Sequence, residues 1–186
     1  MTFEIPFNKD IYKRQTNLQL NSYWEKTLKK HKKNLYFSIG AILLGILAIY
    51  GNGNVGYVFL IIGIYGCIEF YKINTSYQNS KKEFQKITNN EIEVQIESNE
   101  NSFWEFNEDF FRYKDCKYEA KIKWKTFKSF RIIEDNIFLN LNIGNQSSYI
   151  LAKEEVGADS FESIINFVDS KIKEPATNSR LARLGF

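Results

Sequence analysis

The chain has 186 residues, a formal net charge of +3, two cysteines and one histidine, and 44% of its residues are hydrophobic. Two cysteines without metal-ligand spacing exclude a disulfide framework and a zinc-binding module, and we expect no metal site and no cofactor. His31 lies in a lysine run, typical of a solvated flank and not of a catalytic base, and the sequence has no phosphate-binding glycine loop and no nucleophile elbow.

Positive charge is concentrated at the start of the chain. Residues 1–34 carry eight Lys or Arg against three acidic residues. Such a cluster attracts anionic headgroups with about 1 kcal/mol per residue, and apolar residues from Leu18 to Leu28 predict an amphipathic helix beside them. We therefore interpret residues 1–34 as a basic amphipathic membrane approach and expect no nucleic-acid partner. The residues expected to face lipid headgroups are Lys26, Lys29, Lys30, Lys32, Lys33 and, further along, Lys72.

Two apolar segments follow, residues 35–50 and 55–71, with Glu69 as their only charged residue. Each rises about 25 Å as a helix against a hydrocarbon core of roughly 30 Å, so flanking Tyr and Lys residues must complete each span. The turn at residues 51–54 joins them, which predicts a two-span transmembrane hairpin over residues 35–71. Each segment has one face of small residues on which the helices can pack closely, namely Ala41, Gly45 and Ala48, and Gly56, Gly63 and Cys67.

Lysines flank both ends of this hairpin, and the turn at residues 51–54 has none. By the positive-inside rule both termini are expected in the cytoplasm of a bacterium, with the hairpin in its cytoplasmic (inner) membrane. Glu69 stands three residues before Lys72, which favours an ion pair at the interface over a role in proton transfer.

A helical connector is expected over residues 72–87, and the period then changes from helical to alternating. Residues 91–97 alternate without a fault and predict a strand with one buried face, followed by a polar turn at residues 98–102. Further short strands are expected around Trp104 and Phe106 and at residues 110–113, 117–124, 130–133, 137–143 and 148–152. Their short connections, including the turns at residues 134–136 and 144–146, predict an antiparallel meander.

A last helix is expected from about Asp159, with Glu162 as its capping partner, to Pro175. Its apolar stripe should pack on the sheet and cover Trp124. Residues 88–175 would thus form a cytoplasmic β domain with a C-terminal helix, and residues 176–186 a flexible tail. The stripe consists of Phe161, Ile164, Ile165, Val168 and Ile172.

This order of elements resembles the YcxB-like family of small bacterial membrane proteins. The resemblance is carried by residues 122–124, 130–135, 137–142 and 149–153 and the final helix, where a strand bearing a tryptophan precedes an acidic turn, a strand and a helix. It implies an α+β membrane protein with a pleckstrin-homology-like β-barrel or sandwich closed by the helix. It implies no activity.

Function is predicted to reside in binding and not in catalysis, because acidic pairs on strand ends and turns are usually solvated. Five aromatic residues are too dense for one face of a strand to bury, so we predict a partner-binding surface, with cover by the approach helix as the alternative. They are Phe103, Trp104, Phe106, Phe110 and Phe111.

The sequence therefore favours a non-catalytic, membrane-anchored protein-interaction module whose partner is an unknown protein, such as a toxin or a second copy of this chain. One alternative is an immunity protein that neutralises a membrane-acting bacterial toxin. Another is a scaffold that binds anionic lipid through a basic sheet face, for which the candidates are Lys117, Lys121, Lys123, Lys125 and Lys128.

Overall fold

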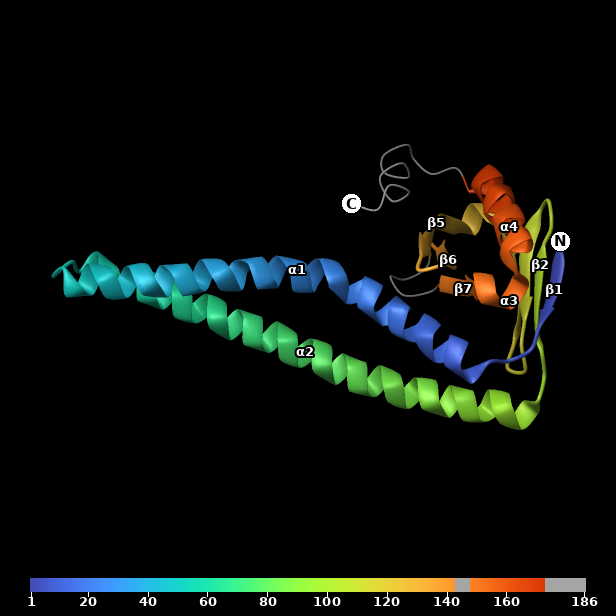
Figure 1. The fold of residues 1–186 in the computed structure, drawn as a ribbon, viewed down its shortest axis with the longest axis horizontal. Coiled ribbons are helices and arrows are strands. Elements are labelled where there is room, and N and C mark those ends of the chain that lie inside the picture. Colours follow the sequence, from blue (N-terminus) through green and yellow to red (C-terminus); the bar gives the residue numbers. More distant parts are fainter. Residues whose placement is uncertain (143–147, 173–186) are drawn as a thin grey trace. The chain divides into compact units, whose positions relative to one another are not determined.

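A computed structural model describes residues 1–142 and 148–172 (Figure 1). The chain divides into two compact units. We call residues 20–87 the hairpin unit, and residues 1–19 together with everything from residue 88 onward the α+β unit. The predicted turn at residues 144–146, the helix end at Pro175 and the tail at residues 176–186 lie outside the described residues.

Two long helices were predicted correctly, although both extend well beyond the apolar segments. Helix α1 spans Lys9–Tyr50 and helix α2 spans Val55–Ser98, and the turn between them brings them antiparallel (Figure 1). Asn52 adopts a left-handed conformation with φ 58°, and the amide of Gly53 donates to the carbonyl of Ala48 at 2.8 Å. The left-handed residue stops the helix, and the Gly53 amide satisfies a carbonyl of its last turn, as is common at helix C-termini.

The small residues of the hairpin unit do place the two helices in close contact. A Cβ atom at Gly56 would lie 2.5 Å from the carbonyl oxygen of Gly45, and one at Gly63 would lie 2.7 Å from that of Ser38. By contrast, a Cβ at Gly40 would meet nothing within 4 Å. The predicted packing face is therefore confirmed at Gly45, Gly56 and Gly63.

The strand predicted at residues 91–97 is wrong, because α2 continues through this segment to Ser98. The buried side chains here follow a helical spacing and not an alternating one. Thr88 and Ile92, four residues apart, are buried, whereas Val94 and Ile96 are about half exposed. No glycine or proline interrupts the chain between Cys67 and this point, so the helix propagates until Asn99 takes a left-handed conformation with φ 50°. The helix therefore overrides the local alternation.

In the described part of the chain, seven antiparallel strands form two sheets of the α+β unit. The first sheet has the order β1-β2-β3-β4, with β1 Thr2–Ile5, β2 Ser102–Phe106, β3 Phe110–Lys114 and β4 Glu119–Lys123. The second has the order β5-β6-β7, with β5 Phe127–Ile133, β6 Asn136–Leu141 and β7 Ser148–Ala152. The meander is confirmed, but β1 was missed, since residues 1–34 were assigned to a membrane approach.

The two sheets do not close into a barrel, which corrects that part of the expected architecture. After β4 the chain makes a short 3-10 turn, η1 at Trp124–Thr126, and enters the second sheet, so β4 and β5 are not paired. The β5–β6 hairpin then turns through Glu134 and Asp135, both left-handed with φ 47° and 57°. This conformation is that of a two-residue hairpin turn.

One core joins both sheets to helix α4, Ala158–Lys171. Trp124 is buried as predicted, its ring centroid lies 5.7 Å from that of Phe167 on α4, and its indole donates to the carbonyl of Asn107 at 2.8 Å. The predicted stripe packs there too. Helix α4 begins at Ala158, and its N-cap residue Gly157 makes no side-chain hydrogen bond, so the cap predicted at Asp159 and Glu162 is wrong. A separate short helix, α3 Lys153–Val156, precedes it.

Candidate functional site

Three of the five aromatic residues predicted to bind a partner are buried in the core of the α+β unit. Trp104 is 5% exposed, Phe106 1% and Phe111 0%. They are covered by the second sheet, as in the contact of Phe111 with Tyr149 at 5.0 Å between ring centroids. The predicted surface is therefore wrong for these three residues, because a second sheet supplies the cover that one strand face could not.

Phe103 and Phe110 lie on the opposite face of the first sheet and are half-buried. The guanidinium of Arg112 lies 5.5 Å from the ring centroid of Phe103, and the ammonium of Lys121 lies 3.8 Å from that of Phe110. Their cover therefore comes from cationic side chains of the same sheet. Within the hairpin unit, Trp24 of the predicted approach helix packs on Tyr77, with 5.7 Å between the ring centroids.

A cavity of about 210 Å³ lies in the α+β unit. Its walls come from the β1–α1 connection, the first turns of α1, the last turns of α2, the inner face of the first sheet, β7 and α3. Its polar and aromatic lining includes Tyr12, Gln15, Glu91, Gln95, Trp104, Tyr113, Asp115, Lys117, Tyr118, Tyr149 and Glu155.

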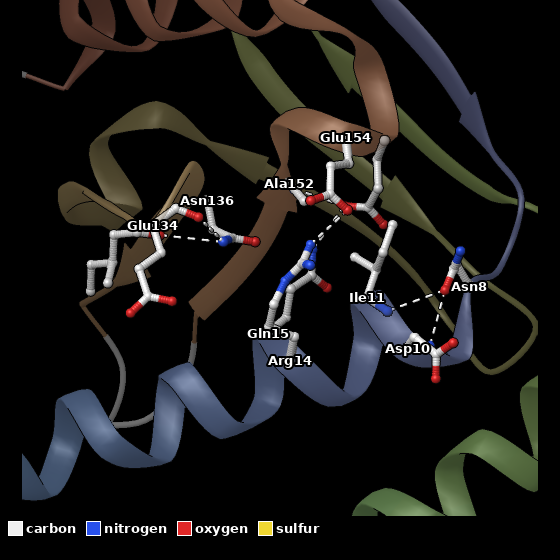
Figure 2. A network of polar contacts seen from close by, with 11 residues as sticks. Asn8, Asp10, Ile11, Arg14, Gln15, Glu134, Asn136, Ala152 and Glu154 are labelled. Carbon is white, nitrogen blue, oxygen red and sulfur yellow. Dashed lines mark hydrogen bonds and ion pairs between the residues drawn. The ribbon is translucent and has the colours of Figure 1, made fainter.

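The start of α1 is held in place by polar contacts along one wall (Figure 2). The side-chain oxygen of Asn8 accepts from the amides of Asp10 at 3.0 Å and Ile11 at 3.2 Å, an N-cap. One turn later the guanidinium of Arg14 donates to Glu154 at 2.8 Å, and the amide of Gln15 donates to Glu155 at 2.8 Å. These contacts fix α1 against the segment that follows β7.

A second set of polar contacts around the cavity centres on Glu91 and Asp115. The hydroxyl of Tyr12 donates to Glu91 at 2.7 Å, and the ammonium of Lys117 lies 3.5 Å from the other oxygen of Glu91. Asp115 accepts from the hydroxyl of Tyr113 at 3.0 Å and, through its other oxygen, from the backbone amides of residues 117 and 118 at 2.8 and 2.9 Å. Each carboxylate is thus already engaged within the wall.

The electrostatic environment of the cavity is acidic. Burial, followed by the hydrogen bond to Glu91, raises the pKa of Tyr12 far above the ordinary value, and burial, followed by the charge of Asp115, does the same to the pKa of Tyr113, so both phenols stay neutral. Burial also raises the pKa of Glu155, although bonds from Gln15 and from the amide of Ala152 oppose the effect. Low solvent access and neighbouring negative charge therefore both raise the pKa values of acidic groups in this cavity.

Sequence reasoning missed this cavity for two reasons. Glu91 and Gln95 face it because residues 91–97 are helical, and they lie four residues apart on one side of α2. Tyr12 was assigned to a membrane approach. The density of tyrosines, 11 in the whole chain, was the available signal, but nothing in the sequence shows which of them converge.

The lysines predicted to face lipid all lie in the hairpin unit and are exposed. The expected pair of Lys72 with Glu69 is present at 3.3 Å. The lysines predicted to form a basic sheet face do not all lie together. Lys121 and Lys123 lie on β4, whereas Lys117 lines the cavity.

Within residues 1–142 and 148–172, no cluster of three or more His, Cys, Asp or Glu side chains is suited to hold a metal ion. Comparison of the chain with protein-family models, with curated proteins and with solved structures gave no match.

Proposed function

We propose that the chain is a non-catalytic, membrane-anchored binding protein, in which the hairpin unit crosses the bacterial cytoplasmic membrane twice and the α+β unit works in the cytoplasm. The observation that carries the proposal is the exposure of large apolar side chains on both helices. Phe37 is 73% exposed, Leu47 67% and Ile61 68%. Exposing so much apolar surface to water is strongly unfavourable, whereas the same side chains are compatible with the apolar lipid chains of a bilayer.

Two further features support the anchor. Both helices are long and apolar enough to cross a membrane. Close glycine contacts between them are typical of membrane helices, which associate by backbone packing because lipid removes the hydrophobic driving force. The exposed lysines of the approach and Lys72 favour the cytoplasmic side for both ends of the hairpin. A YcxB-like membrane protein would have the same placement.

Binding is preferred to catalysis because of how the cavity is built. Its carboxylates are held in hydrogen bonds to phenols, amides and Lys117, and the one histidine of the chain lies in the hairpin unit. Such a wall can recognise a ligand by charge and aromatic surface, but it has no base positioned beside a nucleophile.

Alkaline carbonate extraction of cell membranes tests the anchor. The native chain should stay in the membrane pellet, and a variant with Leu43→Lys and Ile61→Lys should leave it, because both exposed positions lie near the middle of a span and a charge at mid-membrane costs about 2.5–3.5 kcal/mol on insertion scales. Lys128→Glu, on an exposed strand position of the α+β unit, is the control and should stay in the pellet. Recovery of the native chain as a monodisperse soluble protein would contradict the proposal.

A further inference from the structure

The cavity of the α+β unit combines an excess of acidic groups with aromatic walls. Three titratable acids line it, Glu91, Asp115 and Glu155, against one base, Lys117. Lys117 is already paired with Glu91. An anionic ligand would therefore meet repulsion from most of the wall, whereas a cation would be attracted.

Four aromatic side chains of this wall form a continuous cluster. Ring centroids lie 5.1 Å apart for Trp104 and Tyr113, 5.1 Å for Tyr113 and Tyr149, and 5.6 Å for Tyr113 and Tyr118. The raised pKa values of Tyr113 and Tyr118 mean that these phenols carry no charge near neutral pH. Neutral rings with a negative quadrupole at each face attract a cation that comes within about 6 Å.

The hydrogen bonds of the wall decide which kind of cation fits. Asp115 accepts bonds at both oxygens, Glu91 is bonded to Tyr12 and Lys117, and one oxygen of Glu155 accepts from Gln15 and from the amide of Ala152. A primary ammonium brings three donors that need acceptors, and most carboxylate oxygens of this wall already accept at least one hydrogen bond. A methylated ammonium brings none, and needs only charge and aromatic surface.

The size of the cavity agrees with a small ion. Its volume is about 210 Å³. That space suits an organic cation of fewer than about ten non-hydrogen atoms and is smaller than the usual pocket for a drug-sized ligand.

We propose that this cavity is a binding site for a methylated ammonium group, held by the tyrosine and tryptophan rings in the field of Glu91 and Asp115. The inference rests on the proposed binding function but not on membrane insertion. The group can belong to a free solute or to a lipid headgroup, since both present the same cation to the site.

The test is isothermal titration of the full chain in neutral maltoside micelles, because a detergent with an ammonium headgroup would occupy the site. Choline is compared with 3,3-dimethylbutan-1-ol, which has the same shape without the charge, and with ethanolamine, which keeps the charge but not the methyl groups. A short-chain phosphocholine lipid below its micelle-forming concentration forms a further arm. Tighter binding of choline assigns the site to a free solute, and tighter binding of the lipid assigns it to a headgroup.

The proposal predicts that choline or the phosphocholine lipid binds at least tenfold more tightly than either control compound. Glu91→Gln keeps an acceptor for Tyr12 and should weaken binding at least fivefold, and so should Tyr118→Leu. Tyr118→Phe keeps the ring and should bind as the native chain does. Phe103→Leu, on the opposite face of the first sheet, is the control outside the cavity.

Several results would overturn the inference. These are equal affinity for choline and its neutral analogue, stronger binding of ethanolamine, binding of inorganic phosphate instead, or no heat with any compound while circular dichroism shows a folded chain. The titration is done in micelles, so its failure is distinct from failure of the membrane anchor, which carbonate extraction reports separately.

Discussion

The two units of this chain treat apolar side chains in opposite ways. In the α+β unit the largest rings lie inside, where Phe106 and Phe111 are almost inaccessible, whereas in the hairpin unit residues such as Leu47 and Phe37 face outward. The hairpin unit instead buries its smallest residues, because glycines bring the helix backbones together. The α+β unit therefore has the apolar core of a domain that is surrounded by water. The outward apolar side chains of the hairpin unit are the basis for proposing that lipid surrounds it.

Removing a core ring gives the largest expected effect on this contrast. Phe111→Ala should lower the free energy of unfolding of the α+β unit by roughly 3–5 kcal/mol, since it leaves a cavity among both sheets. Urea denaturation of the full chain in micelles, followed by near-ultraviolet circular dichroism, measures it. Leu47→Ala, which removes an outward-facing side chain of the hairpin unit, should leave this transition unchanged. A comparable loss in both variants would contradict the contrast.

The glycine contacts give the next largest effect. Gly63→Ile would force a side chain against Ile42 and the backbone of Ser38, and should destabilise the hairpin unit by about 1–3 kcal/mol, the usual cost of overpacking. Gly40→Ile is the matched control, because a Cβ there meets nothing within 4 Å. The thermal unfolding of α1 and α2 in micelles measures the difference. Equal stability of the two variants would mean that the helices do not pack through Gly63.

The hairpin was readable from the sequence because lipid-like composition, small-residue spacing and a glycine-rich turn all indicate the same element. The failures lie where local and long-range signals conflict. Residues 91–97 alternate like a strand, yet they continue a helix that nothing interrupts. β1 pairs with β2 across about a hundred residues of chain, so no local pattern could locate it.

The cavity could not be predicted for the same reason. Its walls combine the beginning of α1, the end of α2 and strands from both sheets, and only the fold brings them together. A fragment starting at residue 88 would lack β1 and Tyr12, so the α+β unit has to be studied in the full chain.

Alkaline pH should act on the tyrosines of the cavity. Unfolded tyrosines lose their protons near pH 10, whereas burial and nearby carboxylates raise the pKa of Tyr12 and Tyr113 well above that value in the folded unit. The unfolded state therefore releases protons that the folded state keeps, and the free energy of unfolding should fall as pH rises above 10. Tyr113→Phe should give a shallower fall in denaturation curves measured across this range. An unchanged slope would contradict the burial of Tyr113.

The smallest expected effect concerns the β5–β6 turn. Glu134 is left-handed with φ 47°, a conformation that costs a side-chain-bearing residue about 1–2 kcal/mol. Glu134→Gly should therefore stabilise the α+β unit by about 1 kcal/mol or less, after allowing for the freedom that glycine adds to the unfolded chain. Lys128→Gly, within strand β5, should destabilise it. The sign of the two shifts in urea midpoint tests the turn.

Thiol labelling in intact cells tests the membrane topology most directly. In a background with Cys67→Ala and Cys116→Ala, a cysteine replaces Asn52 in the hairpin turn or Asn99 after α2. If both ends of the hairpin face the cytoplasm, the cysteine at position 52 should react with a membrane-impermeant thiol reagent in intact cells, and the one at position 99 should react only after permeabilisation. Labelling at position 99 alone would invert the topology, and labelling at neither position until lysis would contradict a hairpin that crosses the membrane.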